Sequence, residues 1–173
     1  LRNANFTAPE WTKRPTAVLL ENALIDTIAV APAIPAHLRA PGDPGTYIVQ
    51  ARGRIDESFR ATLRQAGASV ISYIPNNAYL VRATGEAAQT LAGQRRVQSV
   101  LPYEPYYKLK TDLLRLAVGN ADLPLNEPLN VALFADAHDD TVAALKGLGA
   151  AILAEEPSPF GPVVTVRPRP DTL

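Results

Sequence analysis

The chain has 173 residues, with 17 acidic and 17 basic side chains and therefore a net charge of zero. This length suits one domain or two small ones, and the balanced charge gives no reason to prefer nucleic acid or an anionic membrane as a partner. The lack of cysteine excludes disulfides, thiolate chemistry and cysteine-ligated zinc. No apolar run approaches the roughly 20 residues that span a bilayer. Together with the balanced charge, this means that neither a membrane nor nucleic acid is an expected partner. Because residue 1 is not methionine and no signal-peptide pattern follows it, we expect a piece of a longer precursor.

Residues 1–45 are expected to form a proline-rich extended arm. Its prolines are Pro9, Pro15, Pro32, Pro35, Pro41 and Pro44. Between them, residues 16–20 and 22–27 are typical of extended apolar segments, which we expect to lie along a surface rather than to form a core. The arm ends in Asp43-Pro44-Gly45, a turn signal because proline presets φ and glycine accepts a positive φ.

Residues 46–109 alternate strand-like and helix-like segments. The expected strands are 46–50, 69–74, 78–82 and 97–101, and the expected helices are 56–66 and 85–92. This order is that of a split βαβ unit. We therefore predict an α+β fold, in which a ferredoxin-like βαββαβ module has an antiparallel sheet with both helices on one face.

Local signals place the ends of these helices. Asp56 and Thr84 are suitable N-cap residues, and Gly67 follows the first helix where a left-handed residue is favoured. An apolar stripe of Phe59, Leu63 and Ala66 follows helical spacing. Between the two middle strands, Asn76 and Asn77 tolerate left-handed geometry, which indicates a tight hairpin.

A second, partial copy of this module is expected in residues 129–173, after a linker in residues 110–128. It is expected to supply three strands, the first at 131–134 and the third at 163–166, and a helix that begins near Asp139 and Asp140. The helix carries an apolar stripe of Val142, Leu145 and Leu148. The run 148–152 after this helix parallels the run 66–70 after the helix of the first copy.

The strands of the first module are apolar on both faces, whereas a half-buried antiparallel strand should alternate apolar and polar residues. One face is assigned to the two helices, so the other needs a cover as well. The sequence leaves two covers open: the arm or second copy of this chain, or another protein. A module of about 56 residues is also marginally stable alone, which favours folding against a further surface.

No catalytic or metal constellation emerges, and we expect a non-catalytic protein with no cofactor and no metal. Only His37 and His138 could serve a serine nucleophile, and no serine lies in a nucleophile-elbow segment. Asp26 resembles the aspartate of subtilisin-like proteases, but Ile28 stands where glycine is expected, so a turn or capping role is favoured. The run His138-Asp139-Asp140 fits a helix start better than a metal site.

Other weak signals have simple structural readings. Glu155 and Glu156 are expected in solvent, and Gly147-Leu148-Gly149 is expected at a helix end rather than in a phosphate loop. Asn5-Phe6-Thr7 is a formal glycosylation sequon.

An aromatic tail follows the last strand of the first module and is the best functional candidate. It consists of Tyr103, Glu104, Pro105, Tyr106, Tyr107, Lys108 and Leu109. Pro102 and Pro105 are expected to hold it extended. Its side chains could then fill pockets while its backbone pairs with a sheet edge. The competing interpretation is a linker whose tyrosines pack locally between the two copies.

The run Ile74-Pro75-Asn76-Asn77-Ala78-Tyr79-Leu80-Val81, with Tyr47-Ile48-Val49-Gln50 before it and Pro102-Tyr103 after it, resembles the N-terminal propeptide of secreted subtilisin-like serine proteases of the fervidolysin type. The resemblance covers about a third of the chain. It implies a ferredoxin-like fold whose sheet packs on the protease, assists folding of the catalytic domain, and places the tail in the active-site cleft as an inhibitor. It also implies a catalytic domain in the same precursor as partner, and a secreted or bacterial cell-envelope location.

Two other functions stay open at this point. The first is a cell-surface protein–protein interaction module that uses the exposed sheet face and leaves protease activity untouched. The second is a ligand-sensing βαββαβ regulatory domain that pairs as a dimer around a small molecule.

Overall fold

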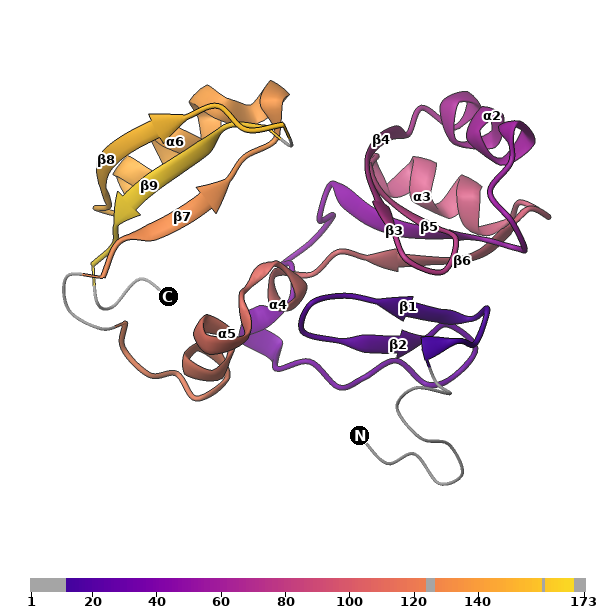
Figure 1. The fold of residues 1–173 in the computed structure, drawn as a ribbon, viewed down its shortest axis with the longest axis horizontal. Coiled ribbons are helices and arrows are strands. Elements are labelled where there is room, and N and C mark those ends of the chain that lie inside the picture. Colours follow the sequence, from indigo (N-terminus) through magenta and orange to yellow (C-terminus); the bar gives the residue numbers. More distant parts are fainter. Residues whose placement is uncertain (1–11, 124–126, 160, 170–173) are drawn as a thin grey trace. The chain divides into compact units, whose positions relative to one another are not determined.

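The computed structural model describes residues 12–123, 127–159 and 161–169. The chain divides into two compact units, residues 1–111 and residues 112–173. Both are built from antiparallel sheets and short helices, so the fold is α+β (Figure 1). The elements of the first unit are β1 (Ala17–Leu19), β2 (Leu24–Asp26), the 3₁₀ helix η1 (Ala36–Leu38), β3 (Thr46–Ala51), α2 (Glu57–Gln65), β4 (Ser69–Ile74), β5 (Ala78–Arg82), α3 (Gly85–Ala92), β6 (Val97–Pro102) and α4 (Pro105–Lys108).

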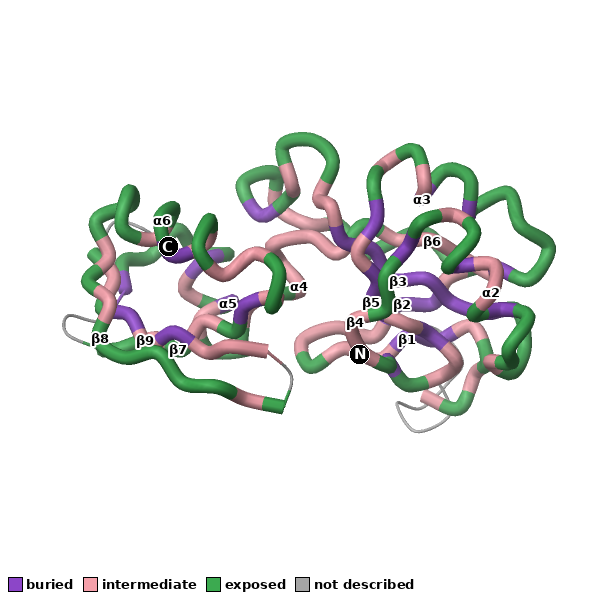
Figure 2. Tube along the Cα trace, turned by 90° about the horizontal axis from the view of Figure 1, so that it is seen from above, coloured by how far each residue is buried: buried purple, intermediate pink, exposed green. Residues whose placement is uncertain are grey.

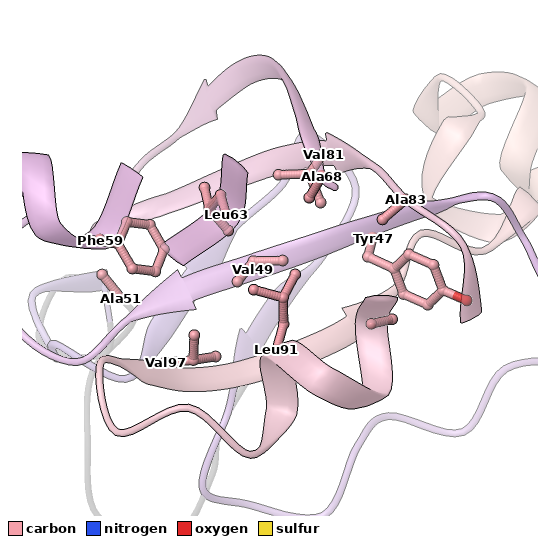
Figure 3. Packing of buried hydrophobic residues seen from close by; sticks show 11 residues of the cluster. Tyr47, Val49, Ala51, Phe59, Leu63, Ala68, Val81, Ala83, Leu91 and Val97 are labelled. Atoms are coloured by element: carbon pink, nitrogen blue, oxygen red, sulfur yellow. The ribbon is translucent and has the colours of Figure 1, made fainter. Parts of the chain in front are cut away.

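The centre of the first unit is a four-stranded sheet with the order β4-β5-β3-β6, in which all neighbours are antiparallel. Because side chains alternate across a strand, β3 sends Tyr47, Val49 and Ala51 to one face and Ile48 and Gln50 to the other. The first face packs against α2 and α3 in a cluster that includes Phe59, Leu63 and Leu91 (Figure 3). Helices on one face of the sheet were predicted, and this is confirmed.

The other face of the sheet is covered by the arm itself. β1 and β2 pair as an antiparallel hairpin, and Val18 and Ile25 pack against Ile48, Ile74 and Leu80. Val18 and Ile48 are fully buried. The sequence left open whether this face is covered by the chain itself or by another protein. In the structure the arm of the chain covers it. The expectation that the arm forms no core was wrong, because its two strands bury apolar side chains in the second cluster (Figure 2).

The predicted helix ends are confirmed. The Asp56 carboxylate accepts a hydrogen bond from the Phe59 N–H at 2.8 Å, and the Thr84 hydroxyl accepts one from the Ala87 N–H at 3.2 Å. Asn76 and Asn77 both have positive φ, 68° and 62°, in the three-residue loop between the paired residues Ile74 and Ala78.

The predicted extended conformation of the aromatic tail was wrong. Pro105 is the first residue of α4, a position that suits proline because the N–H it lacks would have no intrahelical partner. The Tyr107 N–H donates to the Glu104 carbonyl at 2.9 Å and closes the turn. Pro105 was interpreted as a stiffener of extended chain, but it starts this helical turn instead.

The second unit holds a three-stranded antiparallel sheet with the order β7-β9-β8. Its elements are α5 (Thr111–Val118), which begins at the boundary between the units, β7 (Leu129–Ala132), the 3₁₀ helix η2 (Ala135–Ala137), α6 (His138–Gly147), β8 (Ala151–Glu156) and β9 (Val163–Arg167). Its core contains Leu133, Val142, Val164 and Val166. Helix α5 lies within residues 110–128, where only a linker was expected.

The second unit repeats the start of the first. The order β7-β9-β8 matches β3-β5-β4, and each has its helix between the first two strands in sequence. The β8–β9 ladder has its irregularity between Ile152 and Ala154, and the β4–β5 ladder has one between Val70 and Ser72. These positions coincide in the predicted alignment of the two copies. One detail of that prediction was wrong: Leu148 leaves the apolar stripe and is 59% exposed.

Candidate protein-interaction site

The aromatic tail lies against the second hydrophobic cluster of its own module. Tyr103 and Tyr107 pack beside the buried side chains of that cluster, and their rings stack with centroids 6.4 Å apart. Desolvation by burial raises the pKa of both tyrosines and lowers the pKa of Lys108, whose ammonium group lies 5.8 Å from the centroid of the Tyr103 ring. Every residue of the tail is half-buried except Lys108, which is exposed.

The loop between β1 and β2 holds the tail through Asn22. The Asn22 side-chain amide donates to the carbonyl oxygens of Tyr106, at 2.8 Å, and Leu109, at 2.9 Å. The neighbouring Glu21 carboxylate forms an exposed ion pair with Lys110 at 2.8 Å. The tail is thus fastened at its helical turn and just after it.

A buried glutamine fastens the rest of the arm. Gln50 is fully buried in β3. Its Oε1 accepts from the Thr27 hydroxyl at 2.7 Å, and its Nε2 donates to the carbonyls of Pro15 and Asn76, each at 3.0 Å. Burying an amide without partners is expensive, and here three distant segments satisfy it.

The hairpin loop of the sheet adds one more amide contact. The Asn76 side chain donates to the Thr12 carbonyl at 2.8 Å. Asn22, Gln50 and Asn76 thus each bind a main-chain carbonyl far away in sequence. Sequence analysis missed this role for all three. Gln50 carries a usable signal, because it stands in an apolar strand in phase with the buried Ile48.

Asp26 is structural, as expected. Its side chain is only 3% exposed and forms an ion pair with Arg14 at 2.7 Å. Its other carboxylate oxygen accepts from the Ile28 N–H at 3.3 Å, the turn-type contact predicted for it.

In the second unit His138 lies between two carboxylates. One ring nitrogen is 2.8 Å from Asp139 and the other 2.9 Å from Glu155. Hydrogen bonds to Asp139 and then to Glu155 raise the pKa of His138. Glu155, expected to be only solvated, therefore has a partner. Within the described residues no group of three His, Cys, Asp or Glu side chains is placed to hold a metal ion.

An open cavity of about 520 Å³ lies beside α3 in the first unit. Its lining includes Asp43, Tyr47, Gly85 and Glu104. Asp43 accepts from the Tyr47 hydroxyl at 2.7 Å and from the Gly85 N–H at 2.5 Å. Desolvation by burial is the larger cause, and the hydrogen bond to Asp43 the next, of a rise in the pKa of Tyr47 to about 12. The cavity's polar groups serve the module itself, and Asp43 fixes the start of α3.

Two further sequence features are the glycosylation sequon and the lack of a membrane-spanning segment. The sequon at residues 5–7 lies outside the described residues. No helix in the described ranges has the length and apolarity to cross a bilayer.

Comparison with known proteins adds one relationship. A family model described as a domain of unknown function (DUF8729) matches residues 1–104, more than half of the chain. The match covers the arm together with the four-stranded sheet, the two parts that the amide contacts join. No curated protein and no solved structure matches this chain. The chain belongs to the DUF8729 family of domains of unknown function.

Proposed function

We propose that this chain is the non-catalytic N-terminal region of a secreted or cell-envelope precursor of a bacterial subtilisin-like protease. It acts there as an intramolecular chaperone and transient inhibitor of the catalytic domain of the same precursor. The observation that carries the proposal is the module from β3 to β6. Its strand order β4-β5-β3-β6, with two crossover helices on one face, supports a ferredoxin-like classification.

The residues of the propeptide resemblance build the middle of this sheet. Tyr47 to Gln50 lie in β3, and the run from Ile74 to Val81 forms the turn between β4 and β5 with the strand after it. The run thus encodes a tight hairpin whose two asparagines have positive φ. The residues that carry the propeptide resemblance thus lie in the central strands and the hairpin of the module, which supports the proposal.

The propeptide resemblance implied that the sheet packs on the protease. The sheet face opposite the helices is covered by β1 and β2, so it is not free to pack on a protease in this conformation. The tail, residues 103–109, is bound by Asn22. Entry of the tail into a protease cleft stays a prediction, and it requires these contacts to break. The alternative cell-surface module depended on the same covered face, and no observation favours it.

The test is to add the folded chain to a broad-specificity subtilisin-type peptidase and follow hydrolysis of a chromogenic peptide. We expect dose-dependent inhibition at micromolar chain, and faster recovery of activity when the denatured peptidase refolds in its presence. A chymotrypsin-type serine peptidase is the matched control and should be unaffected. The proposal is contradicted if a micromolar excess of chain changes neither hydrolysis nor refolding.

A further inference from the structure

The two units carry opposite net charges. Residues 1–111 contain 13 basic and eight acidic side chains, a net charge of +5. Residues 112–173 contain four basic and nine acidic side chains, a net charge of −5. Because these charges cancel over the whole chain, two copies do not repel each other at long range, and a net charge near zero favours association.

The positive charge of the first unit gathers on two neighbouring loops. Arg52 and Arg54 follow β3, and Arg95 and Arg96 precede β6. The Arg52 N–H donates to the Arg96 carbonyl at 2.7 Å, so the two loops lie side by side. All four arginines are exposed. We call these four residues the arginine patch.

The arginine patch keeps most of its positive charge. Asp56 forms an ion pair with Arg96 at 2.9 Å. The Arg52 side chain donates to the Val97 carbonyl at 3.4 Å, a contact that leaves the charge of the guanidinium unbalanced. The other two arginines of the patch form no ion pair within the described residues. A single carboxylate of the described chain is therefore paired with this patch.

The negative charge of the second unit gathers where α6 begins and β8 ends. Asp139 and Asp140 lie in the first turn of α6, and Glu155 and Glu156 are the last residues of β8. The His138 ring lies 2.8 Å from Asp139 and 2.9 Å from Glu155, so it brings the two elements together. All four carboxylates belong to exposed residues. We call these four acidic residues the carboxylate patch.

Two basic residues of the same sheet and helix lie at the opposite end of the second unit. Lys146 is in the last turn of α6. Arg167 pairs with Ala151 at the start of β8, whereas Glu156, at its end, pairs with Val163. The charge of this sheet and its helix is thus polarised. The carboxylate patch is left open to cations from outside the unit.

We propose that the arginine patch of one copy of this chain binds the carboxylate patch of a second copy. The two patches have opposite charge, and every copy supplies both. A guanidinium also matches a carboxylate in geometry, with two parallel hydrogen bonds. A nucleic acid or an anionic membrane is a poorer occupant of the arginine patch, because the acidic unit of the same chain would be repelled by it. The proposal does not depend on the proposed function.

The contact should be weak and sensitive to salt, because exposed ion pairs are individually weak and are screened. Sedimentation velocity of the full chain over a range of concentrations measures its self-association. We expect association at about 10 mM salt and monomers at about 1 M, since the screening length falls from about 30 Å to about 3 Å.

Reversing the arginine patch tests its part in the contact. Arg54→Glu combined with Arg95→Glu should weaken association at low salt by about tenfold or more, because like charges then face each other. The matched control is Lys13→Glu combined with Lys110→Glu, at two exposed lysines outside the patch. It changes the net charge by the same amount and should cause a clearly smaller loss.

A charge exchange identifies the second surface. Asp140→Arg combined with Glu156→Arg reverses the carboxylate patch and should also weaken association. An equimolar mixture of this variant with the reversed arginine patch should associate again, because the exchanged charges attract. Both substituted residues are exposed, and thermal melting checks that each variant folds. Glu156→Arg alone takes the place of the double variant if the latter does not fold.

Three results would overturn the proposal. The first is a wild-type chain that stays monomeric at low salt, including one that binds heparin or nucleic acid through the arginine patch instead. The second is a reversed arginine patch that weakens association no more than the lysine control. The third is a mixture of the two reversed variants that fails to associate, since the arginine patch would then meet a different surface. Peptidase inhibition and refolding are separate measurements, so each of these results leaves the proposed function standing.

Discussion

Gly67 and Gly149 occupy equivalent positions in the two units. Each follows a helix with a positive φ, +77° for Gly67 and +81° for Gly149. In both cases the glycine N–H bonds to the carbonyl three residues back, and the next alanine N–H bonds to a carbonyl five residues back. Each cap leads into a strand with an irregularity at the same offset, so the two units share this local geometry.

Replacement of Gly67 by alanine should destabilise the first unit by about 1–2 kcal/mol, because a Cβ is strained in left-handed backbone. Nothing lies within 4 Å of the added Cβ, so the loss measures backbone strain alone. Urea unfolding measures it. Gly42→Ala is the control: its φ is not in the left-handed region and its Cβ also meets nothing within 4 Å. Equal stability of the two variants would contradict the assignment of this cap.

Replacement of Gln50 by leucine should be among the most damaging polar substitutions in the first unit. It leaves the carbonyls of Pro15 and Asn76 without this donor, and each buried group left unpaired costs about 1–3 kcal/mol. The Thr27 hydroxyl keeps the Thr16 carbonyl as its acceptor, at 3.0 Å. We expect a loss of several kcal/mol in urea unfolding. Gln65→Leu, at an exposed glutamine, should stay near the wild type. A neutral Gln50→Leu would show that the arm docks by apolar contact alone.

Asn22→Ala should loosen the aromatic tail while the sheet stays folded. The variant removes two hydrogen bonds to tail carbonyls, which corresponds to about 1–3 kcal/mol of local stability. Limited digestion with chymotrypsin should then cut after Tyr106 or Tyr107 several times faster. Glu21→Ala breaks only the exposed ion pair with Lys110 and should change the rate little. Unchanged cleavage of Asn22→Ala would mean that ring packing alone holds the tail.

The second unit should lose stability as the pH rises above 6.5. Because Asp139 and Glu155 raise the pKa of His138 above its ordinary value of 6.5, the folded state binds a proton more tightly than the unfolded state. The stabilisation is complete below pH 6.5 and disappears as pH passes the higher folded-state pKa. Unfolding of wild type and His138→Ala across pH 5.5–8.5 measures this, with His37→Ala as the control. A pH dependence that survives in His138→Ala would assign the effect to other groups.

Much of the fold could be predicted from the sequence, because the signals were local. The strands at 69–74 and 78–82 and the helix at 85–92 lie where they were predicted. N-caps such as Asp56 and positive-φ turns such as Asn76-Asn77 depend on contacts within a few residues, so the chain order reveals them directly.

The docked arm and the fastened tail were decided by tertiary structure. The apolar strands showed that the second sheet face needs a cover, but they could not show that Val18 and Ile25 supply it. The amides of Asn22 and Gln50 bind backbone carbonyls, which every residue carries, so no side-chain pattern identifies their partners. Sequence determined the module and its need for burial; the contacts between distant segments determined which surfaces are covered and which stay free.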